Sequence, residues 1–157
     1  MKVTRKTPRP ATLADRAARV ARVVERFRGK PFCWHGANCW KLVGALARAL
    51  GHPFPPVPRF RSALGVKAAL RKAGCDNAEQ LLDRHFTRLP APAFARVGDL
   101  VLLPDAADGK VLLGAVCLAD GQGNLFGWHG ADEDDSVGFT SVKFAMGDAV
   151  GAWAVGR

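Results

Sequence analysis

Long hydrophobic runs are missing from this chain of 157 residues. No window approaches the roughly 18 consecutive apolar residues that a membrane-spanning helix requires. The N-terminus is basic, but no apolar stretch follows it, so it does not have the pattern of a secretory signal. We therefore expect a protein that is made in the cytoplasm, stays soluble and has no membrane partner. A hydrophobic content of 48% is enough for one domain with a buried core.

Closely spaced cysteines are also missing from the sequence. The four cysteines include no Cys-x-x-Cys pair, and without a secretory signal they are expected to be reduced thiols rather than a disulfide framework. As an alternative, Cys33, His35 and Cys39 could supply three zinc ligands, with Cys75 or Cys117 as the fourth. The spacing Cys-x-His-x-x-x-Cys is not a usual zinc motif. We predict no metal and no other cofactor.

Acidic residues are few, at 14 against 23 lysines and arginines, which gives a net charge of +9. The basic residues are scattered over the first two thirds of the chain, where helices also need a solvated face, whereas residues 105–135 carry most of the acidic surplus. No zinc-finger spacing and no aromatic-rich basic strand of the RNA-recognition type occurs. The asymmetry suits docking to other proteins as well as it suits nucleic acid, and because no nucleic-acid motif is visible we do not expect a nucleic-acid partner.

The order of the apolar patterns predicts a short arm and one domain. Residues 1–11 hold two prolines and four basic residues without periodicity, which is typical of a flexible basic arm. Residues 12–88 show apolar residues at helical spacing, and residues 97–156 contain short apolar runs between turn residues. Helices followed by antiparallel strands predict a single α+β domain over residues 12–157.

Individual elements follow from their caps and breakers. Four polar residues that favour helix N-caps precede the helical patterns: Thr12, Asn38, Ser62 and Asn77. The segment 52–58 contains four prolines and is expected to be irregular. About five strands are predicted, over residues 98–103, 110–118, 124–128, 142–144 and 152–155. Asp99 is expected to accept hydrogen bonds from nearby backbone N–H groups, and Trp34 and Trp40 are expected to pack in the core.

The junction at Cys39 is the most informative place in the sequence. Asn38 is a good N-cap, so Cys39 lies in the first turn of a helix, where free backbone N–H groups and the helix dipole favour a thiolate. Nucleophilic cysteines are often presented in this way. The alternative is that Cys39 is a small buried residue at a helix start, since free cysteine is among the most buried residue types.

The same junction resembles the motif of the NlpC-type, papain-like cysteine peptidases. In that family an aromatic-x-Trp-Gly stretch precedes Asp-Cys and the start of a helix, and Phe32 to Val43 is similar to a shortened form of it. Val97 to Val101 resembles the family's Pro-Gly-Asp-Leu-Val strand, and Val111 to Val116 occupies the place of its His-Val-Gly-Ile strand. Leu125 to His129 corresponds to the next strand. The resemblance covers residues 17–156 and implies N-terminal helices packed on an antiparallel sheet of about five strands.

Two departures from the family pattern concern the chemistry. Asn38 stands where the family usually has aspartate, which preserves the helix cap. Leu112 or Leu113 stands where the general-base histidine is expected, and leucine cannot accept the thiol proton. His129 on the neighbouring strand and His35 in the loop are alternative bases. The candidate site residues are therefore Cys39 as nucleophile, His129 and His35 as bases, and Asn38 as the cap.

The departures also bear on function. Members of the superfamily with this pattern are often encoded in bacteriophage tail modules. The resemblance implies a tail-tip or tail-assembly component of the virion, with other tail proteins as partners and with a degenerate peptidase site. The alternative is an active cysteine endopeptidase that cleaves peptidoglycan stem peptides with Cys39 as nucleophile.

Overall fold

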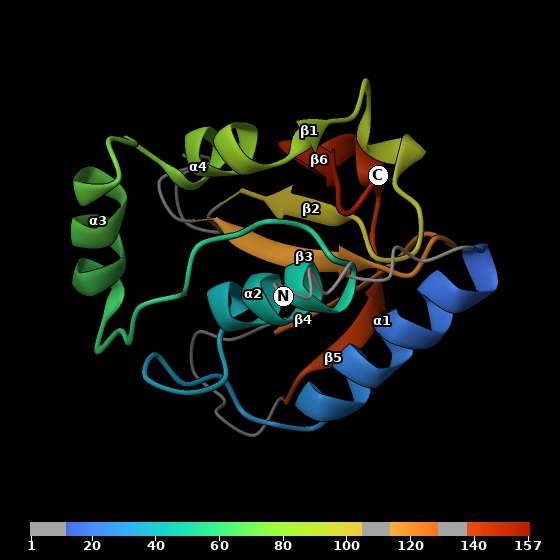
Figure 1. Cartoon of the computed structure of the whole chain (residues 1–157), viewed down its shortest axis with the longest axis horizontal. Helices are drawn as coiled ribbons and strands as arrows, with labels where there is room; N and C mark the ends of the chain where they lie inside the picture. Colours follow the sequence, from blue (N-terminus) through green and yellow to red (C-terminus); the bar gives the residue numbers. More distant parts are fainter. Residues whose placement is uncertain (1–11, 105–113, 129–137) are drawn as a thin grey trace, which may run out of the picture.

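The fold, taken from a computed structural model that describes residues 12–104, 114–128 and 138–157, is α+β (Figure 1). Within these residues it contains four α-helices and one six-stranded antiparallel sheet. The helices are α1 (Leu13–Phe27), α2 (Cys39–Ala49), α3 (Ala63–Lys72) and α4 (Ala78–His85). The strands are β1 (Thr87–Arg88), β2 (Leu100–Leu103), β3 (Ala115–Ala119), β4 (Asn124–Gly127), β5 (Thr140–Lys143) and β6 (Gly151–Ala154). Two short 3₁₀ turns, η1 (Pro92–Phe94) and η2 (Met146–Asp148), complete the described elements.

All four predicted helix caps are confirmed. In each case the capping side chain accepts a hydrogen bond from the backbone N–H three residues further on, which satisfies one of the free donors of the first turn. The four bonds are Thr12 to Asp15 at 3.1 Å, Asn38 to Lys41 at 3.0 Å, Ser62 to Gly65 at 3.4 Å and Asn77 to Gln80 at 2.9 Å. The helix starts are therefore determined locally.

The strands lie in the order β1-β6-β2-β3-β4-β5, and every neighbouring pair is antiparallel. The prediction of about five strands missed β1, because Thr87 and Arg88 are both exposed and give no alternation of apolar and polar residues. The predicted strand over residues 110–118 is observed as β3 from Ala115 onwards, while residues 110–113 lie outside the described residues.

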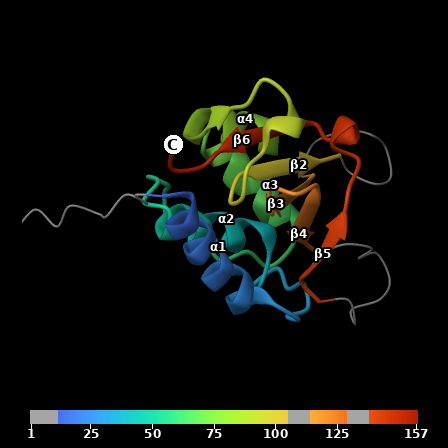
Figure 2. The same cartoon turned by 90° about the vertical axis from the view of Figure 1, so that its right-hand side faces the viewer.

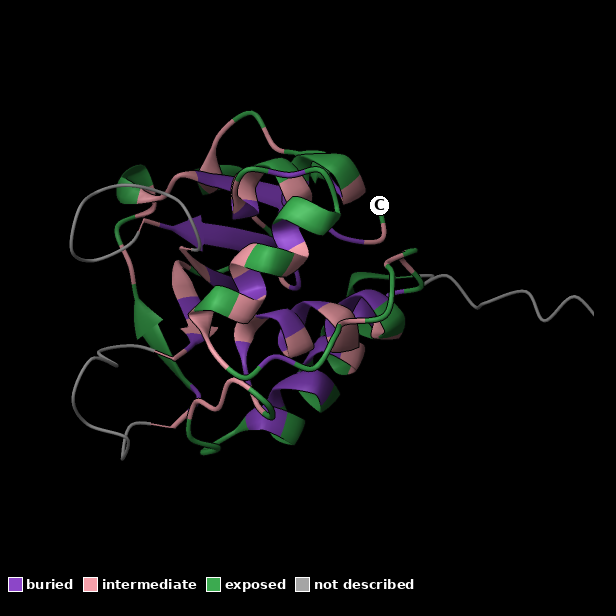
Figure 3. Ribbon diagram, turned by 90° about the vertical axis from the view of Figure 1, so that its left-hand side faces the viewer, coloured by how far each residue is buried: buried purple, intermediate pink, exposed green. Residues whose placement is uncertain are grey.

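Helices α1 and α2 lie together on one side of the sheet (Figure 2). The buried face of α2, which includes Leu42, Val43 and Leu46, belongs to the same core as Val116 and Leu118 of β3. These two strand residues are two positions apart and so point to the same face of the sheet. Figure 3 shows the buried strands running through the centre, with exposed residues on the outer faces of the helices.

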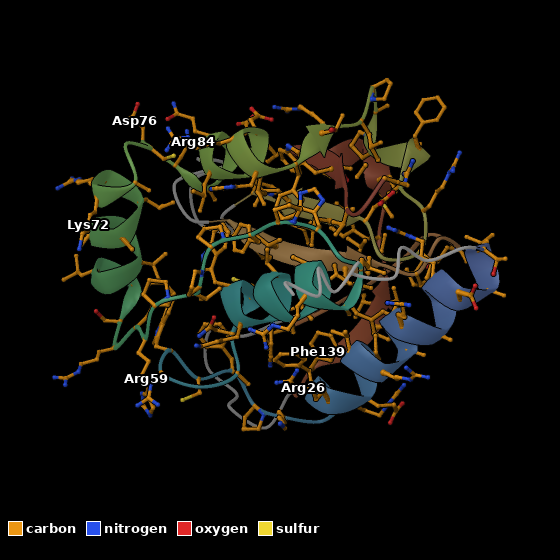
Figure 4. All side chains as sticks on the ribbon, viewed as in Figure 1. Arg26, Arg59, Lys72, Asp76, Arg84 and Phe139 are labelled. Atoms are coloured by element: carbon orange, nitrogen blue, oxygen red, sulfur yellow. The ribbon has the colours of Figure 1, made fainter. Side chains whose placement is uncertain are left out.

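A ring cluster joins the end of α1 to the start of β5. Phe139 is 2% exposed and lies 5.8 Å from Phe27 and 5.0 Å from Trp128, measured between ring centroids (Figure 4). The backbone repeats the connection, because the Gly29 N–H donates to the Phe139 carbonyl and the Phe139 N–H donates to the Lys30 carbonyl. Packing and hydrogen bonds therefore link these distant segments.

The other face of the sheet is buried as well. Val101, Cys117, Leu125 and Ala152 form a second buried cluster there. Met146 of η2 and residues beside the two 3₁₀ turns pack against it, including Ala95, Phe144 and Ala149. Burial on both faces explains why β2 consists only of apolar residues rather than an alternating pattern.

Asp99 binds backbone N–H groups, as predicted, and also holds a buried ion pair. Its carboxylate accepts hydrogen bonds from the N–H groups of Arg96, at 2.8 Å, and Val155, at 3.3 Å. Arg16 of α1 lies 3.0 Å from the same carboxylate, and Arg157 forms a second ion pair with it. The expectation of a solvated basic residue is wrong for Arg16, which is 6% exposed.

All three guanidinium nitrogens of Arg16 donate hydrogen bonds. Its guanidinium also donates to the carbonyls of Val97, at 2.7 Å, and Val155, at 2.6 Å. Burial lowers the pKa of Arg16, and the attraction of Asp99 acts in the opposite direction. Helix α1 is thereby bound to the segments before β2 and after β6. None of the helices in the described part of the chain has the length and apolar character needed to cross a membrane.

Candidate functional site

The loop before α2 is organised by the side chain of Asn38, which is 1% exposed. Its carbonyl oxygen caps the helix, and its Nδ2 group donates to the carbonyls of Trp34 at 2.9 Å, Gly36 at 3.3 Å and Cys33 at 3.4 Å. A carboxylate has no hydrogen to donate. Asparagine at the position where the resembling family has aspartate therefore suits this loop, because an aspartate would set a negative oxygen against three carbonyl oxygens.

Cys39 is the first residue of α2 and is half-buried. Burial raises the pKa of its thiol, and hydrogen bonding to the backbone of Val116, Cys39 and Trp40 offsets part of that rise. The sequence favoured a thiolate at this place. The helix-start N–H groups are present, but loss of solvent outweighs them, so the thiol stays protonated at neutral pH.

The register of the sheet explains why Val116 faces the thiol. The N–H of Ala119 donates to the Asp99 carbonyl beside β2, so the N–H groups of alternate residues along β3 point away from β2. The N–H groups of Ala115 and Cys117 therefore point toward β2, like that of Ala119, whereas the N–H groups of Val116 and Leu118 point away from β2. Strand β4 pairs with β3 only at Leu118 and Ala119. At Val116 the edge of β3 is therefore turned to α2 instead of to β4.

Cys39 forms part of the wall of a cavity of about 610 Å³. Four aromatic residues dominate the lining: Phe32, Trp34, Trp40 and Trp128. Phe32 lies edge-on to Trp34 at 4.8 Å and to Trp128 at 5.9 Å, and the Trp128 indole donates to the Lys30 carbonyl at 2.9 Å. Trp40 is in the core, as predicted, and Trp34 is half-buried against it. A cavity of this size can hold an amino-acid side chain or a short peptide segment.

Of the two predicted bases, His35 lies within the described residues and His129 does not. His35 is exposed and lines the same cavity, but within the described residues no hydrogen bond joins it to Cys39. His129, Leu112 and Leu113 lie outside the described residues. The described part of β3 contributes no imidazole to the cavity wall.

His52 is a structural residue whose role the sequence did not reveal. Its Nδ1 accepts a hydrogen bond from the Gly156 N–H at 2.9 Å, so its Nε2 carries the proton that is donated to the His85 carbonyl at 2.6 Å. The ring stacks on Phe86 with centroids 4.5 Å apart. Burial lowers the pKa of His85, with smaller contributions from Arg84 and His52. Both partners of His52 are far away in the sequence, so no local pattern could show the bonds.

The zinc alternative finds no support among the described residues, where no group of three His, Cys, Asp or Glu side chains could hold a metal ion. The four cysteines are free thiols, and Cys75 and Cys117 are buried. Burial, with a smaller contribution from Cys39, raises the pKa of Cys117 to about 12. Cys117 and Cys39 line the same cavity.

Comparison with known proteins places the chain in a family without supplying an activity. No curated protein sequence matches it. The family model described as a domain of unknown function, DUF6950, matches residues 11–155, which is nearly the whole chain. The chain therefore belongs to the DUF6950 family.

Proposed function

We propose that this chain is a tail-assembly component of a bacteriophage, built on a papain-like, NlpC-type domain that does not hydrolyse peptides. The order of the motifs around Cys39, Asp99 and β3 supports the relation to the NlpC type. A helix that carries a cysteine at its start and packs on an antiparallel sheet agrees with it. The phage-tail role rests on that resemblance.

One observation supports the proposed loss of peptidase activity, namely the environment of the Cys39 thiol. A cysteine peptidase needs a thiolate and a base that removes and returns the proton. Here the thiol is desolvated against the backbone of β3, its pKa is raised, and no described imidazole is hydrogen-bonded to it. Without a described base beside the thiol, the aromatic cavity is better suited to hold a segment of a neighbouring protein than to cleave one.

An active endopeptidase is the second candidate, and one observation favours it. Cys39 and His35 line the same cavity, which also includes Trp128, the residue before His129 in the sequence. In this scheme an imidazole takes the thiol proton as sulfur attacks the peptide carbonyl. The proton then passes to the leaving amine. Water hydrolyses the resulting thioester, and N–H groups at Val116 and Cys39 stabilise the oxyanion.

The two candidates are separated by incubating the purified protein with peptidoglycan stem peptides, beside the Cys39→Ala variant. We expect neither protein to release fragments above the buffer control. Cleavage by the unchanged protein that is lost in Cys39→Ala would overturn the non-catalytic assignment, provided that circular dichroism shows both proteins folded.

The tail role is tested separately in the phage or prophage genome that encodes the chain. We expect deletion of the gene to abolish complete tails in electron micrographs, and a Cys39→Ser gene to restore them. Normal tails after the deletion would refute the assembly role, whatever the result with stem peptides.

A further inference from the structure

A second cavity, of about 620 Å³, lies between the end of α1, the outer face of α2 and the proline-rich segment 52–57. It shares no lining residue with the cavity at Cys39. We call it the basic cleft, because four cationic side chains line it: Arg26, Lys30, Lys41 and Arg48.

One face of α2 forms the floor of the basic cleft. Gly44 and Ala45 come three and four positions after Lys41, and Arg48 comes four and three positions after them, so all four lie along one side of the helix. The two small residues leave room between the two cations, whose Cα atoms are about 10 Å apart at 1.5 Å of rise per residue. Val57 closes the wall, because a Cβ atom added at Gly44 would lie 2.9 Å from its Cγ2.

Among the described residues, no acidic side chain balances the positive charge of the basic cleft. No carboxylate lines it, and none of its four cations forms an ion pair there, whereas Arg16, Arg28, Arg88 and Arg157 each have an acidic partner. The Lys41 amine donates to the Val57 carbonyl at 3.3 Å, which leaves its charge uncompensated. Cations gathered without carboxylates attract an anionic ligand.

We propose that the basic cleft binds an extended, acidic segment of a partner protein. In an extended segment with the polyproline II conformation, which has three residues per turn, carboxylates three residues apart lie on the same side and about 9 Å apart, close to the separation of Lys41 and Arg48. Arg26 at the end of α1 and Lys30 in the segment after it supply charge on the other side. Pro53, Pro55 and Pro56 provide an apolar wall for the segment's other side chains.

Single-stranded nucleic acid fits the basic cleft less well, because it binds through free aromatic faces as well as cations. The rings here are already used by the protein. Phe54 stacks on Phe86 at 5.4 Å and meets His85 edge-on at 5.1 Å, and Phe27 packs against Trp128 and Phe139. The charge is therefore better matched by carboxylates than by a chain of bases.

This inference rests on the proposed function only in taking the partner to be a protein of the tail. Its test uses the full chain and a fluorescein-labelled peptide of eight alternating Asp and Glu residues, with binding measured by fluorescence anisotropy. The variant is Arg26→Gln with Arg48→Gln. The control is Arg59→Gln with Lys72→Gln, which removes the same charge. Figure 4 shows Arg59 and Lys72 at the α3 end of the molecule, whereas Arg26 comes from α1.

We expect the cleft variant to bind the peptide about tenfold more weakly and the control to bind like the unchanged protein. Arg26 and Arg48 of the cleft variant and Lys72 of the control all lie in the last turn of a helix, so each variant loses at least one cation that favours a helix end. Ala45→Glu is a second variant, which keeps all four cations but places a carboxylate between Lys41 and Arg48. It should weaken peptide binding as the cleft variant does, while circular dichroism shows that the protein is folded.

Equal weakening in the cleft variant and the control would overturn the proposal, because it would indicate a general effect of charge. Absence of peptide binding to the unchanged protein would overturn it too. Tighter binding of an oligothymidylate, lost in the cleft variant, would replace the protein partner by nucleic acid. Cys39→Ser should leave peptide binding intact. Failure of peptide binding is distinct from failure of the assembly role, because the gene deletion tests that role separately.

Discussion

Asn38 shows how one amide group can serve a helix and a loop at once. Its side-chain oxygen accepts the capping hydrogen bond of α2, and its side-chain nitrogen donates to three carbonyls of the loop. The cap was predictable from residue type, because capping bonds reach only three residues along the chain. The donation to Cys33, Trp34 and Gly36 was not, since it depends on the path of the loop.

Asn38→Asp is expected to lower the free energy of unfolding by about 1–3 kcal/mol, because the buried loop carbonyls lose their donors. Urea denaturation followed by circular dichroism measures this. Asn77→Asp is the matched control, because Asn77 caps α4 in the same way and aspartate caps equally well. Equal stability of the two variants would show that the Nδ2 bonds contribute nothing.

The two raised thiol pKa values predict a loss of stability in alkali. In the unfolded chain Cys39 and Cys117 ionise near pH 9.0, whereas burial keeps both protonated to higher pH in the folded protein. The unfolded state therefore binds fewer protons above that pH, and the free energy of unfolding falls by about 1.4 kcal/mol per pH unit for each such thiol.

Cys117→Ala should reduce this alkaline slope, measured as urea midpoints between pH 8 and pH 11. Cys33→Ala is the control, since Cys33 is half-buried in the loop. The same slope in the Cys117→Ala variant and the unchanged protein would contradict the assignment.

At the scale of elements, the sequence predicted what is local and missed what is distant. All four helices follow from caps and apolar spacing within eight to fifteen residues. Strand β1 is held by its pairing with β6, more than sixty positions away in register, and its own two residues carry no pattern. The burial of Arg16 was not predictable, because its partner, Asp99, lies on another element.

In the candidate site, too, local features were predictable from the sequence and features that depend on distant contacts were not. The position of Cys39 at a helix start follows from Asn38 beside it, and the structure confirms it. The protonation state of its thiol was not predictable, because it depends on β3, which contacts α2 only in the folded chain. His35 stays a predicted base that shares the cavity, and His129 stays a prediction outside the described residues.

The buried ion pair that joins α1 to the sheet gives a prediction at this scale. Asp99→Asn should lower the free energy of unfolding by about 3–5 kcal/mol, because Arg16 would be left buried without its counter-charge. Glu25→Gln, which breaks the exposed pair with Arg28, should change it by less than about 1 kcal/mol. Chemical denaturation of both variants at one pH compares them, and similar losses would refute the special role of Asp99.

For the whole molecule, the strand order makes β6 indispensable. It lies between β1 and β2, and its Trp153 is fully buried and donates to the Asp83 carboxylate at 2.8 Å. A chain that ends at residue 149 should therefore show no cooperative thermal unfolding. Addition of a synthetic peptide of residues 150–157 should restore it, and a cooperative transition without the peptide would contradict the prediction.

The same strand order has a consequence for synthesis on the ribosome. Strand β6 follows all the other described strands along the chain, yet it pairs with β2 in the interior of the sheet. Until residues 151–154 have been translated, β2 presents an open edge of apolar residues that can pair with another nascent chain. Interrupted translation should therefore yield aggregates rather than a shortened fold, and slow translation of the final segment should lower the yield of native protein.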